Sequence, residues 1–412
     1  MAEKVDLGAA TEDDVQHFVE HAFSVDFVFR SPHHQKGRQQ KETTDVLAVY
    51  DDVAIPIEVK AQAYNADGSP REESAAWTKK TLEKAVGQVK GSVRMLRGTG
   101  TVRLQNVRRG ELVFDPAKSH FFYGLIVLNH VSQPFSAEEL VPEIAASDFP
   151  IHVLSFGDFF NLNRVLDTPA DLVGYLEMRA DVLVPTLKPR VHEEKRLIDY
   201  YFENLEALTE FRAKLRGEIV PAAKVKPYAD TYRSIYRGDC PDIEHSYYVD
   251  RIIDRAHEID DSSPSPFEDL AGAPKSDYAI IAEQLSHIVR PRRIYLGRMF
   301  RDAIERAGRR NEIEFATVSS KLRDECLLFM ASPRPDTERA ERNKDLRDYL
   351  LLLKAARQVT RGLGIATEAG FGRSRSYDFI LVEEDPAVVV ARSDYATIKE
   401  LGDGLFGTAT PR

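Results

Sequence analysis

The stretch TTDVLAVYDDVAIPIEVKAQ, residues 43–62, decides the fold of the N-terminal part of the chain. Two runs of alternating apolar residues, VLAVY and VAIPIEVK, flank a pair of aspartates, which is typical of a β-hairpin with a two-residue turn. Such a turn pairs residues whose numbers sum to 103. Asp45 is therefore predicted to lie directly opposite Glu58, with Lys60 pointing to the same face of the sheet.

Pro56 lies inside the second strand of this hairpin. The register places it at a position that makes no hydrogen bond to the first strand, so its missing N–H costs nothing on that side. We expect it to weaken the pairing with a strand on the other side.

The three charged side chains on this face allow two interpretations. Carboxylates at cross-strand distance repel each other by about 4 kcal/mol, at about 4 Å and an effective dielectric of about 20. Mg²⁺ (or Mn²⁺) would relieve that repulsion, because such cations prefer oxygen ligands, and this makes Asp45 and Glu58 candidate metal ligands. The alternative is a solvated hairpin face, on which Lys60 pairs with both acids and each pair contributes ~0 to 1 kcal/mol.

The segment before the hairpin predicts a helix, a strand and a loop. Thr11 followed by Asp14 is typical of a helix start, and apolar residues then recur at helical spacing as far as Phe23. Residues 23–32, FSVDFVFRSP, alternate like a short strand. Residues 33–42, HHQKGRQQKE, indicate a polar loop.

A helix and a buried strand are predicted after the hairpin. Residues 77–98, WTKKTLEKAVGQVKGSVRMLRG, carry an apolar stripe typical of a helix packed on a sheet, and Gly87 and Gly91 would permit a close approach. Residues 120–131, HFFYGLIVLNHV, form a near-continuous apolar run that indicates a central strand. The predicted order is therefore helix, strand, hairpin, helix, buried strand.

This order and the residues on it resemble the PD-(D/E)XK nuclease superfamily. The resemblance covers roughly residues 10–130. It is carried by an acid at the start of one strand, an acid and a lysine on the next, and a glutamine on the following helix: Asp45, Glu58, Val59, Lys60 and Gln88. It implies an α/β protein with a restriction-endonuclease-like αβββαβ core and a mixed sheet.

The resemblance also implies a metal site. Asp45, Glu58 and the carbonyl of Val59 would bind Mg²⁺ (or Mn²⁺), and Lys60 would be the catalytic lysine. Thr44 replaces the proline that gives the motif its name, a departure that leaves these groups in place.

Residues on the two helices complete the predicted site. By resemblance, Gln88 would contact the active site or the phosphate backbone, and Glu20 would match the family's helix acid by location. Basic residues on the helix of Gln88 are candidates for binding nucleic acid, DNA more than RNA: Lys80, Lys84, Lys90 and Arg94. The alternative for these residues is a solvated helix face.

The chain as a whole reads as a soluble protein. Its 412 residues are 43% hydrophobic and 30% charged, which suits two or three domains. No apolar run could span a membrane and the N-terminus is too polar for a signal peptide, so the expected location is the cytoplasm, without a membrane partner. The net charge of −10 argues against nonspecific coating of nucleic acid. Cys240 and Cys326 support neither a disulfide framework nor a thiolate metal cluster.

Three regions are predicted: a nuclease-like domain at residues 1–190, a helical segment at 191–262 and a C-terminal α/β domain at 275–412. We expect a metal-dependent endonuclease that hydrolyses phosphodiester bonds, acting in restriction or anti-phage defence, as a monomer or a homo-oligomer. One alternative is a catalytically inactive nucleic-acid-binding or scaffold protein. Another is a sensor or effector whose activity lies in the C-terminal half.

Overall fold

The structure is a computed structural model of the 412-residue chain. It describes residues 7–23, 25–30, 32–36, 39–50, 52–61, 75–98, 102–106, 110–129, 133–180, 189–215, 226–258, 277–320, 324–369, 375–383 and 405–406. In the predicted hairpin turn, Asp52 is described and Asp51 lies outside these residues.

The chain divides into two compact units, and among the described residues unit 1 runs to Cys240 and unit 2 begins at Pro241. Unit 1 contains α1 (Leu7–Phe23), η1 (Val25–Phe27), β1 (Val28–Arg30), β2 (His33–Lys36), β3 (Gln39–Glu42), β4 (Val46–Tyr50), β5 (Val53–Lys60), α2 (Ala75–Arg97), β6 (Val102–Asn106), β7 (Gly110–Val113), η2 (Pro116–Lys118), β8 (Phe121–Phe122), β9 (Gly124–Leu128), α3 (Ala137–Leu140), β10 (Ile151–Ser155), α4 (Phe156–Val165), α5 (Pro169–Ala180), α6 (Glu194–Leu215) and α7 (Lys226–Arg237). Unit 2 contains α8 (Ile243–Glu258), α9 (Asp277–Ser286), α10 (Arg290–Arg310), β11 (Glu314–Ser320), β12 (Glu325–Ser332), η4 (Asp336–Glu338), α11 (Arg339–Arg357), β13 (Arg361–Glu368) and β14 (Tyr377–Val382). None of these described helices has the length and apolar composition that a membrane span requires.

The two units do not follow the three regions predicted from the sequence. Apolar residues of α6 and α7 belong to the core of unit 1, whereas those of α8 belong to the core of unit 2. The predicted helical segment at 191–262 is therefore shared between the two units. α6 and α7 pack on each other, with the ring of Phe202 stacked on that of Tyr232, and on α5 and α4, whereas α8 packs on α9 and α10.

The hairpin predicted from residues 43–62 is confirmed. β4 and β5 pair antiparallel, with Leu47 opposite Pro56 and Tyr50 opposite Val53, so that paired residue numbers sum to 103. This register follows from the two-residue turn and from the alternation of the apolar side chains.

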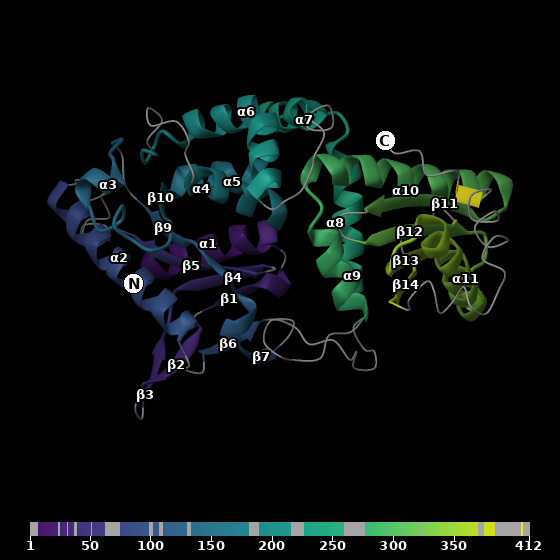
Figure 1. Cartoon of the computed structure of the whole chain (residues 1–412), viewed down its shortest axis with the longest axis horizontal. Helices are drawn as coiled ribbons and strands as arrows, with labels where there is room; N and C mark the ends of the chain where they lie inside the picture. The colour runs from purple at the N-terminus through teal and green to yellow at the C-terminus, as the bar shows by residue number, and fades with distance from the viewer. Residues whose placement is uncertain are drawn as a thin grey trace, which may run out of the picture. The chain divides into compact units, whose positions relative to one another are not determined.

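β5 lies inside a mixed sheet with the strand order β1-β4-β5-β9-β10, and β8 also pairs with β5 (Figure 1). β4 is antiparallel to β5, whereas β9 is parallel to β5 and β10 is parallel to β9. The predicted α/β class is confirmed. Along the chain, α1, β1, the β4–β5 hairpin, α2 and β9 follow one another in the predicted order.

Pro56 interrupts the sheet on one side only. β5 pairs with β8 at Val53 and Ala54, and its pairing with β9 begins at Ile57. The break between β8 and β9 falls beside Pro56, which has no N–H to donate to a neighbouring strand. The expected weakening of the pairing opposite β4 is therefore confirmed.

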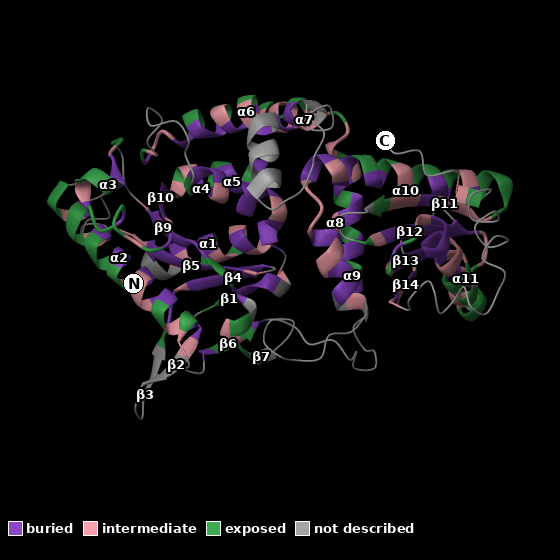
Figure 2. Ribbon diagram, viewed as in Figure 1, coloured by how far each residue is buried: buried purple, intermediate pink, exposed green. Residues whose placement is uncertain are grey.

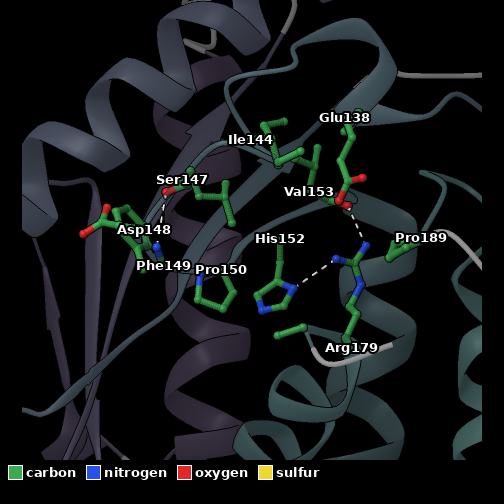
Figure 3. Close-up of a pocket in the computed structure, with 14 residues that line it drawn as sticks. Glu138, Ile144, Ser147, Asp148, Phe149, Pro150, His152, Val153, Arg179 and Pro189 are labelled. Carbon is green, nitrogen blue, oxygen red and sulfur yellow. Dashed lines mark hydrogen bonds between the residues drawn. The ribbon is translucent and has the colours of Figure 1, made fainter. Parts of the chain in front are cut away.

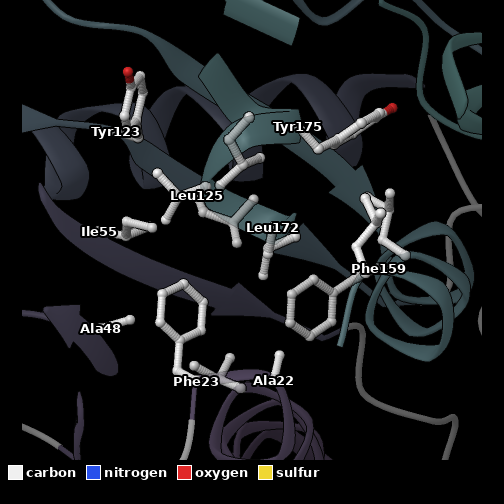
Figure 4. Packing of buried hydrophobic residues seen from close by; sticks show 14 of the residues in the cluster. Ala22, Phe23, Ala48, Ile55, Tyr123, Leu125, Phe159, Leu172 and Tyr175 are labelled. Carbon is white, nitrogen blue, oxygen red and sulfur yellow. The ribbon is translucent and has the colours of Figure 1, made fainter. Parts of the chain in front are cut away.

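Most residues of β4 and β5 are buried (Figure 2), and an apolar cluster lies on each face of the sheet. α1, α4 and α5 pack on the face that carries Ala48, Ile55 and Val59 (Figure 4). α2 packs on the opposite face, against Leu47 and Ala54. Because side chains alternate along a strand, the acid that precedes Val59 faces the side of α2.

A glycine of the strand, and not of the helix, permits the close approach of α2. A Cβ added at Gly87 or Gly91 would meet nothing within 4 Å. A Cβ added at Gly124 of β9 would collide with the side chain of Val89 on α2. The prediction that the helix glycines serve this purpose is therefore wrong.

The polar segment at residues 33–42, predicted as a loop, instead forms the hairpin of β2 and β3. It belongs to a second sheet with the order β3-β2-β6-β7. Asn106, at the end of β6, donates hydrogen bonds to the carbonyls of Val25 (2.7 Å) and Val28 (2.9 Å), which attaches this sheet to the first. Pairing with β6 therefore overrides the polar composition of the segment.

Unit 2 is also an α/β structure. Its sheet has the order β11-β12-β13-β14, with a parallel pair, β12 and β13, between two antiparallel pairs. α8, α9 and α10 contribute to the apolar core on one face, and α11 contributes to the core on the other. This agrees with the C-terminal α/β region predicted from the sequence.

Candidate active site

The acid pair lies where the β4–β5 ladder ends, at Val46 opposite Ile57. Beyond that point, the N–H of Val59 donates to Oδ2 of Asp45 at 2.7 Å, and the Thr44 hydroxyl donates to the carbonyl of Ile57 at 2.8 Å. Side chains thus replace the backbone bonds that would continue the ladder. A proline in the place of Thr44 could not make the second of these bonds, because it has no hydroxyl.

Three oxygen atoms converge on the ammonium group of Lys60. Its Nζ lies 2.9 Å from Oε2 of Glu58, 3.0 Å from the carbonyl oxygen of Val59 and 3.4 Å from Oδ2 of Asp45. These are the three groups that the sequence nominated as metal ligands. The fold therefore gathers them around a single cation, which in this structure is the ammonium.

The side chains of this cluster are withdrawn from solvent. Glu58 is 1% exposed, Asp45 13% and Lys60 15%. The alternative of a solvated hairpin face is right about the pairing of Lys60 with the two acids and wrong about their exposure. Burial makes the cost of any unbalanced charge much larger than it would be in water.

The electrostatics of the cluster reflect an excess of negative charge. Burial raises the pKa of Glu58 to about 7 and the charge of Asp45 adds to this effect, while Lys60 opposes it. Burial lowers the pKa of Lys60, but the two acids outweigh it, so that this pKa is raised. At neutral pH the lysine is charged and Glu58 is close to its titration midpoint. One base does not neutralise two acids here.

The helix acid coupled to the site is Glu12 and not Glu20. Burial and the charge of Asp45 raise the pKa of Glu12, while Lys60 acts on it in the opposite direction. Glu20 lies eight residues farther along α1, a distance of about 12 Å at the rise of an α-helix. Its carboxylate accepts a hydrogen bond from Gln16 at 2.6 Å. The role assigned to Glu20 by location therefore fits Glu12 better.

The sequence contains a periodic signal for Glu12. It precedes Val15 by three residues and Val19 by seven, which places it on the apolar stripe of α1. The sequence did not predict this position of Glu12, because it assigned Thr11 as the cap that precedes the helix. α1 spans Leu7–Phe23, so Thr11 lies inside the helix.

Asn129 is a second residue that the sequence reasoning missed. It directly follows β9, and its backbone N–H donates to the carbonyl of Lys60 at 2.8 Å. Its side-chain amide donates to the hydroxyl of Thr11 at 2.9 Å. Asn129 thereby joins the end of β5 to the helix that carries Glu12. No local sequence pattern predicts this contact, because Thr11 and Lys60 are both distant from Asn129 in the sequence.

Gln88 lies on α2 without a described interaction with the acid pair. Its Oε1 is buried and has no hydrogen-bond partner among the described residues. Ser92, one turn farther on, lies within hydrogen-bond distance of the carbonyls of Gln88 (2.9 Å) and Thr43. This turn of the helix is therefore attached to the backbone just before Asp45, and an active-site role for Gln88 stays a prediction.

The predicted basic residues of α2 differ in their surroundings. Lys80, Lys84 and Arg94 are exposed. Lys90 is half-buried, and its ammonium donates to the carbonyl of Glu143 at 2.7 Å. Lys90 is therefore engaged within unit 1, and the other three are the ones available to a polyanion.

The residues of the cluster fit a hard divalent cation by their chemistry. Mg²⁺ takes oxygen ligands and commonly one or two carboxylates, and the site offers two carboxylates and a carbonyl with excess negative charge. In the part of the chain that the structure describes, no three His, Cys, Asp or Glu side chains form a ready metal cluster. The ammonium of Lys60 lies between the carboxylates and the Val59 carbonyl, so a metal ion would have to displace it.

Comparison of the chain with protein-family models, with curated proteins and with solved structures finds no match. The geometry of this site and the motif that its residues resemble are therefore the two observations that bear on function.

Proposed function

We propose that this protein is a metal-dependent nuclease that hydrolyses phosphodiester bonds of nucleic acid, with DNA as the favoured substrate. The observation that carries the proposal is the convergence of Asp45, Glu58 and the Val59 carbonyl on one cation, within 3.4 Å of Nζ of Lys60. Asp45 directly precedes β4, and Glu58 and Val59 lie on β5, which are the two strands that the PD-(D/E)XK motif implies. The order of α1, β1, the hairpin, α2 and β9 is also the order that the resemblance implies.

Asp45, Glu58 and the carbonyl of Val59 would hold Mg²⁺ or Mn²⁺, with Glu12 adding negative charge nearby. When bound, such a cation polarises a phosphate and favours ionisation of a water molecule. The Val59 N–H already orients the carboxylate of Asp45. Glu58 must lose its proton to act as a ligand, which its pKa of about 7 permits at slightly alkaline pH.

Lys60 would supply positive charge to the reaction. Its raised pKa keeps the ammonium protonated at neutral pH. A protonated ammonium cannot accept a proton from water, but it can donate hydrogen bonds to a phosphate oxygen and stabilise the charge that develops on it. The geometry of β5 places this group beside both acids.

The exposed basic residues of α2 would contact the phosphate backbone. Lys80 and Lys84 are spaced to lie on one side of the helix, and Arg94 is exposed farther along it. A short basic strip of this kind positions a substrate without reading its sequence. A cytoplasmic role in restriction or anti-phage defence forms part of the proposal, and only the resemblance supports it.

The proposal is tested by incubating the purified full chain with double-stranded DNA, single-stranded DNA and RNA, each with Mg²⁺, with Mn²⁺ and with EDTA. We expect cleavage that requires a metal and that falls by roughly a thousandfold in Glu58→Ala and Lys60→Ala, as removal of a group that stabilises transition-state charge does. Glu83→Ala, which changes an exposed acid of α2, is the matched control and should cleave like the parent.

Two outcomes contradict the proposal. One is the absence of cleavage under every condition. The other is cleavage that survives both Glu58→Ala and Lys60→Ala. Binding of DNA or RNA in a gel-shift experiment without any cleavage would favour the catalytically inactive nucleic-acid-binding protein instead.

A further inference from the structure

The ammonium of Lys60 lies among the same oxygens that the proposed function assigns to a metal ion. Its Nζ is within 3.4 Å of carboxylate oxygens of Asp45 and Glu58, and 3.0 Å from the carbonyl oxygen of Val59. Two cations that shared these oxygens would repel each other strongly, because the cluster is largely withdrawn from water. The lysine and the ion therefore compete for one place.

This competition is strongest in the free protein. The ammonium forms ion pairs with both acids, at 2.9 Å to Glu58 and at 3.4 Å to Asp45. If the ammonium leaves the cluster, it loses the attraction of both carboxylates, and water alone accepts its hydrogen bonds. An ion that enters the free protein must therefore replace two ion pairs at once.

The cluster is open to solvent on the side of the lysine. The side chain of Lys60 is 15% exposed and that of Asp45 13%, whereas that of Glu58 is 1% exposed. A lysine carries its charge at the end of a flexible stem, so the ammonium can turn outward while the backbone of β5 keeps its place. A phosphate that approaches from solvent then offers what water does not, a negative charge together with acceptor oxygens.

Arg179, beside a cavity of about 300 Å³ in unit 1, is a buried base that is held differently (Figure 3). Its Nε donates to Glu194 at 2.8 Å, its Nη2 donates to the carbonyl of Val153 at 3.1 Å, and its Nη1 lies 3.0 Å from Nδ1 of His152. All three nitrogens of a planar group are engaged, and the side chain is 4% exposed. Lys60 has one nitrogen and greater exposure, so a single movement of its stem releases every contact.

We propose that Lys60 couples the binding of the metal ion to the binding of the nucleic acid. Its ammonium competes with the ion for Asp45 and Glu58 until a phosphate of the substrate accepts the ammonium. This inference rests on the proposed function, in which both ligands meet at this site. Coupling between two ligands is reciprocal, so the ion raises the affinity for nucleic acid by the same factor by which nucleic acid raises the affinity for the ion.

The first test measures the metal alone. Mn²⁺ is titrated calorimetrically into the full chain at one fixed, slightly alkaline pH, without nucleic acid. Lys60→Met removes the competing charge, and the Kd for Mn²⁺ should fall by at least about tenfold. Lys60→Arg keeps the positive charge and should leave the Kd within about threefold of the parent value. Lys195→Met, at an exposed position of α6, is the matched control and should leave it unchanged.

The variant Lys60→Met leaves two acids without their base, and it could fail to fold for that reason. Lys60→Gln then takes its place, because an amide carries no charge but still donates a hydrogen bond to a carboxylate. The Kd for Mn²⁺ should fall in this variant as well. Circular dichroism of each variant shows that the chain titrated is folded.

The second test measures the reciprocal effect. Fluorescence anisotropy gives the affinity for labelled double-stranded DNA, single-stranded DNA and RNA, each with and without Ca²⁺, which takes the same kind of oxygen ligands. A gel shows that the probes remain intact. For the nucleic acid that binds, Ca²⁺ should raise the affinity of the parent by at least about tenfold, and this factor should be at least about threefold smaller in Lys60→Met.

Two results would overturn the inference while leaving the proposed function in place. One is Mn²⁺ binding that is unchanged or weaker in both Lys60→Met and Lys60→Gln. The other is an effect of Ca²⁺ on nucleic-acid affinity that is absent or is equal in the parent and in Lys60→Met. Metal-dependent cleavage by the parent would stand in both cases. Absence of Mn²⁺ binding in the parent and in both uncharged variants would contradict the inference and the proposed metal site together.

Discussion

Arg342 in unit 2 and Lys60 in unit 1 are both basic side chains among carboxylates, but their surroundings differ. Arg342 is fully buried, and its three nitrogens donate to Asp378, Glu368 and Ser376. A second guanidinium, that of Arg339, also donates to Asp378. Two bases thus face the carboxylates of Asp378 and Glu368, and the exposed carboxylate of Asp336 lies 3.7 Å from Nη2 of Arg342.

In unit 1 the acidic side chains outnumber the basic ones. Two buried acids face Lys60 alone, and Glu12 adds a third acid close by. The pKa values of the acids differ accordingly. Burial opposes the ionisation of Glu368 but hydrogen bonds from Ser376 outweigh it, so the pKa of Glu368 is lowered, whereas that of Glu58 is raised to about 7. A carboxyl group whose pKa is strongly raised, like that of Glu58, is more frequent at functional sites than elsewhere in a protein.

The largest effect is expected from breaking the cluster around Arg342. Arg342→Met should destabilise unit 2 by about 3 to 5 kcal/mol, because it leaves buried carboxylates without their base. Lys344→Met, at an exposed position of the same helix, should change stability by no more than about 0.5 kcal/mol. Amide hydrogen exchange of α11 and β14 in the full chain measures both. Unchanged protection in Arg342→Met would show that the cluster is not structural.

The second effect concerns the pH dependence of stability that Glu58 causes. Its pKa rises from 4.5 to about 7 on folding, so the folded chain binds its proton more tightly than the unfolded chain does. This contribution favours the folded state at low pH and is lost as the pH rises through about 7, which amounts to about 3 kcal/mol.

Chemical denaturation at about pH 5 and about pH 8 measures this dependence. The decrease in stability between the two pH values should be smaller in Glu58→Gln than in the parent, because the amide does not titrate. Glu83→Gln, on an exposed face of α2, should leave it unchanged. An equal decrease in the parent and in Glu58→Gln would contradict the assignment of the raised pKa to Glu58.

The third effect is stabilisation by a divalent cation. At alkaline pH, Mg²⁺ or Mn²⁺ at a hundred times its Kd should stabilise unit 1 by about 2.7 kcal/mol. Below the pKa of Glu58 the cation must displace a proton as well as the ammonium, so the apparent Kd should increase as the pH falls through about 7. Thermal unfolding with and without the cation tests this. Equal stabilisation of the parent and of Asp45→Asn would place the cation elsewhere.

The smallest effect distinguishes the two acids of α1. Glu12→Gln should weaken binding of Mn²⁺ by about three- to tenfold, because a nearby negative charge is lost at a partly exposed position. Glu20→Gln should leave the Kd unchanged, since its carboxylate is bound by Gln16. Isothermal titration of Mn²⁺ into both variants decides between them. A larger effect of Glu20→Gln would restore the assignment made from the sequence.

The sequence predicted what local periodicity determines. The turn length and the alternation of apolar residues specified the register of β4 and β5, and with it the shared face of Asp45, Glu58 and Lys60. Pro56 was placed correctly for the same reason. The hydrogen bonds where the β4–β5 ladder ends could not be predicted. There the side chains of Thr44 and Asp45 take the place of backbone groups.

Contacts between segments that are distant in the chain could not be predicted from the sequence. Asn129 joins Thr11 to Lys60, and Arg179 joins His152 to Glu194, in each case across loops that carry no periodic signal. Glu12 is an intermediate case. Its spacing from Val15 and Val19 is helical, but the sequence placed the start of α1 at Thr11, too late in the chain. Tertiary packing, which no local pattern encodes, decided these positions.

The ammonium of Lys60 affects how the chain folds before any metal ion is bound. The counter-charge is covalently part of β5, so the acid pair is never bare, from the first pairing of the hairpin onward. Small metal-dependent domains commonly stay unfolded until their ion arrives. This chain therefore does not need a divalent ion to balance the acid pair while it folds, and under the proposed function the supply of such ions would control only its activity.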